Sequence, residues 1–191
     1  MSENNNGMGD GFVHTDWQLR LAQMGDVPQL EWLIPHSARV LQRSYYTEAQ
    51  IEAALGPVFG VDRQLIADGT YFVADRCGEI VGCGGWSRRQ SLFGGDASRA
   101  DADNALDPAI DAARVRAFFV HPDWARSGIG RAIMTKCEEA IRAADFRRIE
   151  IVATLAGEPL YRGFGYAVSE RYEIPMRDGL ALPVVRMFKA L

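Results

Sequence analysis

Residues 118–131 read FFVHPDWARSGIGR, and the fold of the chain is organised around this stretch. It begins as the end of an apolar strand, 115–120, and turns at a His-Pro pair. From Gly128 to Ala144 apolar residues recur every three or four positions, which is typical of a helix with one buried face. A second apolar run, Arg148–Ala153, follows that helix. Because a strand-helix-strand unit pairs its strands in parallel, the sequence predicts an α/β protein with at least one parallel pair.

The loop between the first strand and the helix predicts an anion-binding site. The first N–H groups of a helix have no carbonyl partner within the helix, and they carry the positive end of the helix dipole. Gly128 and Gly130 lie in this first turn. Because glycine has no Cβ, a phosphate group can approach the backbone closely.

Three phosphate ligands compete for this loop. A nucleoside triphosphate loop needs Gly-Lys-Ser/Thr, which the chain lacks. A dinucleotide needs a third small residue where Ile133 stands, although Glu150 has the spacing of a ribose ligand. The third ligand is the pyrophosphate of coenzyme A, held by consecutive backbone amides. A tight turn without any ligand is the remaining alternative.

Two motifs favour the third ligand. Residues 120–131, VHPDWARSGIGR, resemble the acetyl-CoA-binding motif of the GNAT (GCN5-related N-acetyltransferase) superfamily, although Ala125 replaces the usual Gln or Arg, with Arg126 one place along. Residues 157–166, GEPLYRGFGY, resemble that family's A-x-x-L-Y-x-x-x-G-F/Y segment. The resemblance runs from Trp17 to the C-terminus. It implies the GNAT fold, a mixed and splayed sheet of six or seven strands flanked by helices, in a single domain over 17–191.

The resemblance also implies roles for individual residues. Main-chain groups of Phe119 and Val120 would pair with the pantetheine arm of acetyl-CoA. Thr154 stands where relatives often carry Asn beside that arm, and Tyr161 would protonate the thiolate that leaves, unless its ring only packs in the core. The pyrophosphate would lie on the amides of six consecutive residues: Arg126, Ser127, Gly128, Ile129, Gly130 and Arg131. The guanidinium groups at the two ends of this run would be charge partners, although Arg131 equally fits a solvated helix face.

The function that follows is an acetyl-CoA-dependent N-acetyltransferase acting on a small-molecule amine. A CoA-binding protein without turnover and an NAD(P)-dependent oxidoreductase are the alternatives. No general base can be identified, and His121 is expected to be structural. Arg116 has two interpretations: it binds a carboxylate of the acceptor, together with Arg88 and Arg89, or it pairs with Glu150 as a structural bridge.

Composition sets limits on partners and compartment. The 191 residues are 48% hydrophobic and 24% charged, as in a soluble globular protein, with a net charge of −4 and a pI near 5.4. This charge gives no reason to expect nucleic acid or a membrane surface as partner. Three scattered cysteines without a CxxC pair argue against a metal site or disulfides. No signal peptide or membrane span is expected, so we predict a cytoplasmic protein, with a homodimer possible.

The N-terminal half predicts several shorter elements. Residues 1–16 form a mobile tail, and a strand covers 17–22. Asp26 caps a helix that Pro35 interrupts or kinks. Thr47 and Gln50 form the capping box of a second helix.

The remaining elements follow from alternation and turn residues. Residues 71–74 and 80–86 form a hairpin whose glycines indicate a bulge or a close approach by another group. The loop from 90 to 111 is long enough to be a substrate-side lid or disordered. Four elements complete the chain: a short helix over 62–67, another over 158–163, and strands over 166–174 and 184–188.

Overall fold

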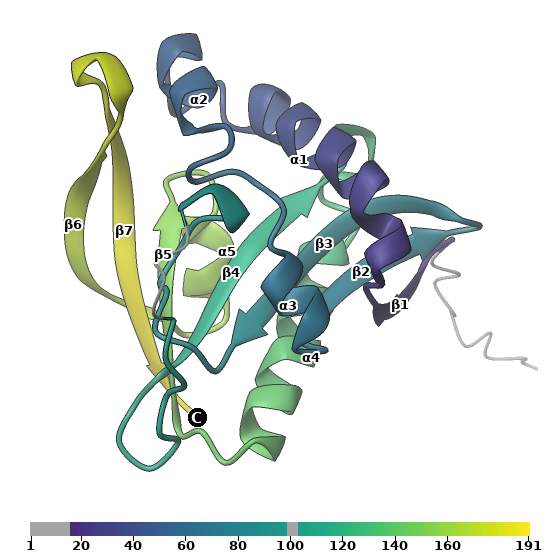
Figure 1. Ribbon diagram of the computed structural model, residues 1–191, viewed down its shortest axis with the longest axis vertical. Coiled ribbons are helices and arrows are strands. Elements are labelled where there is room, and N and C mark those ends of the chain that lie inside the picture. Colours follow the sequence, from purple (N-terminus) through teal and green to yellow (C-terminus); the bar gives the residue numbers. More distant parts are fainter. Residues whose placement is uncertain (1–15, 99–102) are drawn as a thin grey trace, which may run out of the picture.

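The computed structural model describes residues 16–98 and 103–191, which form one seven-stranded sheet with helices on both faces (Figure 1). The strand order is β1-β2-β3-β4-β5-β7-β6, with one parallel pair, β4 and β5, among antiparallel neighbours. The predicted mixed α/β fold is confirmed. The tail predicted for 1–16 lies outside the described residues, apart from Asp16. The strands are β1 Gln18–Leu21, β2 Tyr71–Arg76, β3 Glu79–Ser87, β4 Ala113–Val120, β5 Arg148–Thr154, β6 Ala167–Pro175 and β7 Ala181–Ala190.

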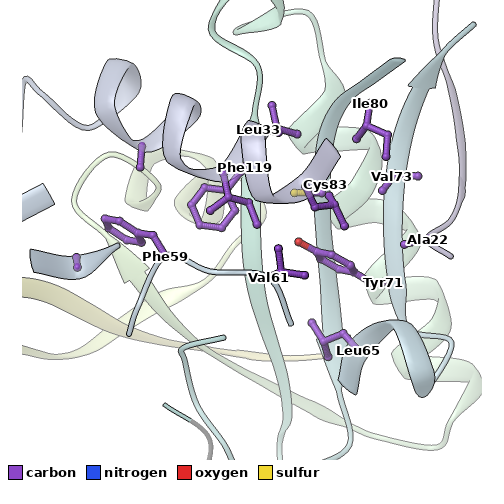
Figure 2. Close-up of a cluster of buried hydrophobic side chains, with 14 of the residues drawn as sticks. Ala22, Leu33, Phe59, Val61, Leu65, Tyr71, Val73, Ile80, Cys83 and Phe119 are labelled. Atoms are coloured by element: carbon purple, nitrogen blue, oxygen red, sulfur yellow. The ribbon is translucent and has the colours of Figure 1, made fainter. Parts of the chain in front are cut away.

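The helices divide the apolar side chains into two cores, one on each face of the sheet. Helices α1 (Val27–Leu41), α2 (Glu48–Ala54) and α3 (Arg63–Ala67) cover the first core, part of which Figure 2 shows. Helices α4 (Ile129–Ala143) and α5 (Glu158–Gly163) cover the second. The apolar stripe predicted on α4 is buried against the sheet. Short 3-10 turns lie at Met24–Asp26, Asp96–Ser98, Pro122–Trp124 and Arg177–Gly179.

Two predictions about helix termini have different outcomes. The Thr47 hydroxyl accepts from the Gln50 N–H and the Gln50 side chain accepts from the Thr47 N–H, so the predicted capping box is confirmed. Asp26 precedes α1, but its carboxylate accepts hydrogen bonds from Arg20 and from the Gln23 N–H instead of capping α1. Pro35 does not interrupt α1, which continues through it for six further residues, 36–41. The apolar face of α1 packs on β3 and β4, and this packing compensates for the lost hydrogen bond.

The sheet opens between its two central strands. Strands β4 and β5 pair only over residues 113–115 and 149–151. Beyond Val115 they diverge, while β5 continues in register with β7 through Thr154. The second half of β4 therefore has one edge that none of the strands described above covers.

A bulge in β4 changes which face its side chains occupy. Arg116 pairs with Gly85 and Phe119 with Cys83, so Ala117 and Phe118 together oppose Gly84. Ala117 has a φ of +61°, and its carbonyl oxygen accepts a hydrogen bond from the Tyr71 hydroxyl, which points into the first core (Figure 2). The alternation of side chains along β4 therefore ends at the bulge: Arg116 contacts Asp62 at the start of α3, and Phe118 packs against the second core.

The glycines of β3 permit close packing, as the sequence indicated. A Cβ on Gly82 would lie 2.5 Å from the Ile129 Cγ2 atom, and a Cβ on Gly84 would lie 2.7 Å from the Phe118 ring. The groups that approach β3 so closely are thus α4 and the bulged part of β4.

The loop over 90–111 is held at both ends where it is described. Arg89 and Ala105 form an isolated antiparallel bridge, and the Asp103 carboxylate accepts from the N–H and hydroxyl of Ser91. Residues 99–102, to which part of the predicted lid or disorder belongs, lie outside the described residues. Within the described parts of the chain, no helix combines the length and hydropathy needed to cross a membrane.

Candidate active site

A cavity of about 760 Å³ occupies the gap between the diverging ends of β4 and β5. One end reaches the loop before α4, and the other reaches the C-terminal end of α1 and the segments around residues 58–59 and 93–94. The floor is formed by the second half of β4, the end of β5 and the first turns of α5.

The N-terminus of α4 provides uncapped amides at the first end of this pocket. Gly128 is the N-cap residue, with a φ of +90°, and within the described residues no side-chain hydrogen bond caps the helix. The first helical bond runs from the Ala132 N–H to the Gly128 carbonyl, so the amides of Ile129, Gly130 and Arg131 have no carbonyl four residues back. Arg126 also has a positive φ, +68°. This backbone fits an anionic group such as a diphosphate.

The polar side chains of the loop differ in their access to the pocket. Arg126 and Arg131 are exposed and line it, and the Arg131 guanidinium lies 5.3 Å from the centre of the Phe164 ring. The Ser127 hydroxyl donates to the Trp124 carbonyl at 2.6 Å, and Ser127 does not line the pocket. Of the six predicted residues, Ser127 is the one that the structure does not bring to the cavity.

The uncovered edge of β4 carries Val120 and not Phe119. The His121 N–H donates to the Val81 carbonyl of β3. Because peptide groups alternate in direction along an antiparallel strand, those of Phe119 point toward β3 and those of Val120 point toward the opening. The prediction for Phe119 is therefore corrected: its side chain lines the pocket, but its peptide groups face the neighbouring strand.

Two residues at this edge were missed. The Ser37 hydroxyl of α1 accepts from the Val120 N–H at 3.3 Å, so the Val120 carbonyl is the group of this residue left toward the pocket. Phe118, two residues before Val120, directs its carbonyl toward the opening, because the N–H of the same peptide, that of Phe119, faces β3. This direction depends on the register with β3, so the sequence of β4 alone carries no signal for it.

Tyr161 lies in α5 at the floor of the pocket. Its ring is buried between Phe118 and Tyr166, with ring centres 6.1 Å apart on each side. Burial raises the pKa of the Tyr161 phenol above its ordinary value of 10. The hydroxyl therefore remains protonated at neutral pH, as a proton donor must.

Thr154 ends β5 beside Tyr161 and is connected to α1. Its hydroxyl oxygen accepts from the Gly157 N–H at 3.1 Å and from the Gln42 side-chain Nε2 at 3.3 Å. Nothing in the residue pattern at the end of α1 distinguishes Gln42, its C-cap residue, from a surface residue, so Gln42 could not be identified from the sequence.

Arginine side chains near the pocket are paired differently from the prediction. The predicted pair of Arg116 and Glu150 is wrong. Arg116 contacts the buried Asp62 at 2.9 Å and donates to the Ser91 carbonyl at 2.6 Å. Glu150 is buried between Arg114 and Arg186, with which it forms salt bridges.

The pocket has an unusual charge balance. Among the described residues that line it, there is no carboxylate and no imidazole. His121 lies outside it, in a stack with Trp32 and His36 on the surface of α1. In the described parts of the chain, no group of three or more His, Cys, Asp and Glu side chains is arranged to hold a metal ion.

Comparison with protein families gives one match. The family model described as an acetyltransferase (GNAT) domain matches residues 67–168, which include β2 through the start of β6 and both motifs. A search of curated proteins finds no match.

Solved structures share the fold at low sequence identity. A GCN5-related N-acetyltransferase from Rhodopseudomonas palustris is 19% identical, with 93% of this chain and 97% of that chain covered and a TM-score of 0.68. The PaiA N-acetyltransferase from Thermoplasma acidophilum, in complex with coenzyme A, is 11% identical, with 92% of this chain and 99% of that chain covered and a TM-score of 0.62. A GNAT family acetyltransferase from Brucella melitensis, in complex with acetyl-CoA, is 15% identical, with 92% of this chain and 88% of that chain covered and a TM-score of 0.55.

Proposed function

The chain belongs to the GNAT family of acetyltransferases, and we propose that it transfers the acetyl group of acetyl-CoA to the amine of a small molecule. Two solved structures with this fold contain coenzyme A or acetyl-CoA, which supports the choice of acyl donor. The observation that carries the proposal is the cavity between β4 and β5, which joins an anion-binding helix N-terminus to a buried tyrosine.

The proposed binding mode uses main-chain groups along the cavity. The diphosphate lies on the amides of Gly128, Ile129, Gly130 and Arg131, with the exposed guanidinium groups of Arg126 and Arg131 as charge partners. The pantetheine arm follows the uncovered edge of β4, where the carbonyl groups of Phe118 and Val120 face the opening. Thr154 lies on the opposite wall.

In the proposed reaction, the amine nitrogen forms a bond to the thioester carbon and the bond between carbon and sulfur breaks. The sulfur takes the proton of the Tyr161 hydroxyl, which burial keeps protonated. The proton of the amine leaves to water, since the described residues that line the pocket include no carboxylate or imidazole. Tyr161 regains its proton from solvent after the products leave.

The test is acetyl-CoA binding by calorimetry, followed by thiol release with a panel of amines. We expect Gly128→Glu to abolish binding, because it places a negative charge in the diphosphate site. Since Gly128 has a positive φ, the matched control is Gly78→Glu in the hairpin turn between β2 and β3. Gly78 has a φ of +93°, and a Cβ there also meets nothing within 4 Å, as at Gly128.

A folded Gly128→Glu variant that binds acetyl-CoA as well as Gly78→Glu would remove the diphosphate assignment. Tight acetyl-CoA binding without thiol release on any amine would instead support a binding protein without turnover.

A further inference from the structure

The half of the pocket away from α4 has an apolar wall. This acceptor half is lined by side chains from α1, from the turn after it, and from the segments before α3 and after β3. Phe59 meets the Phe119 ring edge-on, with ring centres 6.0 Å apart. Such a surface fits the body of an apolar molecule better than a charged one. The residues of the acceptor half are Leu41, Gln42, Tyr45, Val58, Phe59, Phe93 and Arg116.

Among the described residues that line it, the acceptor half offers no negative charge to a protonated amine. The one formal charge in that set is the Arg116 guanidinium, which is paired with Asp62 behind the pocket wall. The other titratable groups that line the whole pocket, as far as the structure describes it, are Tyr45, Tyr161, Arg126 and Arg131, and none is a carboxylate. An ammonium group here would lose its hydration without gaining a counter-charge.

One residue of the acceptor half has a buried acceptor atom. Gln42 is only 9% exposed and lines the cavity, and its Oε1 atom has no hydrogen-bond partner among the described residues. A buried carbonyl oxygen without a donor is costly, so a rotation of the Gln42 amide that turns Oε1 to the cavity would let the N–H of a ligand bind there favourably.

Gln42 is also held beside the proposed reaction centre. Its Nε2 atom donates to Thr154 Oγ1 at 3.3 Å. An ideal Cβ on Gly157 would lie 3.3 Å from this Thr154 hydroxyl oxygen and 3.2 Å from Tyr161 Cε2. The side chains of Thr154 and Tyr161 therefore both lie close to Gly157. An amine that donates one N–H to Gln42 keeps its lone pair for attack on the thioester.

From this arrangement we infer that the acceptor is an apolar, weakly basic amine of the arylamine class, whose N–H donates to Gln42 Oε1. The inference rests on the proposed acetyl transfer and specifies its substrate. An arylamine is uncharged at pH 7 because its lone pair is delocalised into the ring. It therefore needs neither a counter-charge nor a general base to become nucleophilic.

The test compares two isomers of the same composition, 4-ethylaniline and 4-methylbenzylamine, by thiol release with saturating acetyl-CoA. At pH 7 only the second is protonated. We expect kcat/KM for 4-ethylaniline to exceed that for 4-methylbenzylamine by about tenfold or more and to stay flat between about pH 6 and 9. For 4-methylbenzylamine, kcat/KM should rise about tenfold per pH unit as the free amine increases.

Variants of Gln42 test the contact itself. Gln42→Met keeps the length of the side chain but removes the carbonyl, and it should raise KM for 4-ethylaniline while acetyl-CoA affinity is retained. Gln42→Glu adds the missing counter-charge, and it should shift the kcat/KM ratio toward 4-methylbenzylamine by about tenfold. Gln18→Met, on the exposed edge strand β1, is the matched control and should change neither quantity.

Preference for 4-methylbenzylamine at pH 7, a plateau in its pH profile, or unchanged arylamine kinetics in Gln42→Met would each overturn the inference. So would acetyl-CoA binding with no turnover of 4-ethylaniline, and the proposed use of acetyl-CoA would survive all four results. Failure of the chain to bind acetyl-CoA would refute the proposed function itself. If Gln42→Glu does not fold, the comparison of the two isomers and the Gln42→Met variant still test the inference.

Discussion

Gly84→Ala provides a test of the packing between β3 and the bulge in β4. A Cβ at position 84 would lie 2.7 Å from Phe118 Cδ2 and 2.8 Å from Cε2 and Cγ. Since optimal carbon contacts lie at about 3.5–4.0 Å, the methyl group would overlap the ring by about 1 Å. The ring has to move toward Tyr161, its neighbour on the far side.

Overpacking of this kind costs about 1–3 kcal/mol. For a chain of this length we expect Tm to fall by about 2–4 °C for each kcal/mol, or about 4–8 °C for a cost of 2 kcal/mol. The assay is thermal unfolding of the wild-type protein and Gly84→Ala, with kcat measured alongside. Activity should fall too, because the displaced ring presses on the residue proposed to protonate the thiolate.

A double mutant tests whether the Phe118 ring is the obstacle. If the ring is the obstacle, Phe118→Leu should cost less in the Gly84→Ala background than alone, with a coupling energy of about 1 kcal/mol. Gly25→Ala is the control: a Cβ there meets nothing within 4 Å, so stability should change by less than about 0.5 kcal/mol. Additive costs in the double mutant would refute the packing argument.

Three further predictions concern other parts of the chain. Tyr161→Phe should lower kcat by about 100-fold or more with unchanged acetyl-CoA affinity in calorimetry, and an unchanged kcat would exclude the proton-donor role. Cys137→Ala, on the buried face of α4, should lose about 1 kcal/mol in denaturant unfolding with activity retained; the reverse result would indicate a reactive thiol. Arg20 lowers the pKa of Asp26 and Asp75, so their stabilisation is present above the ordinary carboxyl pKa of 3.8 and is lost as pH falls below it. Arg20→Gln should therefore lower the free energy of unfolding at pH 7 and make it depend less steeply on pH in acid. An equally steep dependence on pH in the variant would contradict this.

The order and kind of the elements could be predicted because they depend on local patterns. The hairpin of β2 and β3, the parallel unit of β4, α4 and β5, and the capping box at Thr47 each follow from residues close together in the chain. The fate of Pro35 could not be predicted locally, because the buried face of α1 decides whether the helix tolerates it.

The errors within the candidate site have a common cause. The partner of Arg116 is Asp62, which the packing of α3 brings close to it. Nothing in the sequence of β4 indicates this partner. The direction of the Phe119 peptide groups depends on its register with β3, and the face of Phe118 depends on the bulge at Ala117. Register and bulges are properties of strand pairs, so the sequence of one strand does not define them.

The three residue pairs between β4 and β5 make the sheet two half-sheets, β1–β4 and β5–β7, with a narrow seam between them. Tyr46 adds a second connection across the seam: it accepts from the Leu155 N–H and donates to the Pro183 carbonyl, each at 2.8 Å. A ligand that binds in the seam only when both halves are in place couples its binding to their association. Saturation at about 100 times Kd would then add about 2.7 kcal/mol to the stability of the folded chain. For the proposed acetyl-CoA site, ligand occupancy and the association of the two half-sheets would therefore be linked.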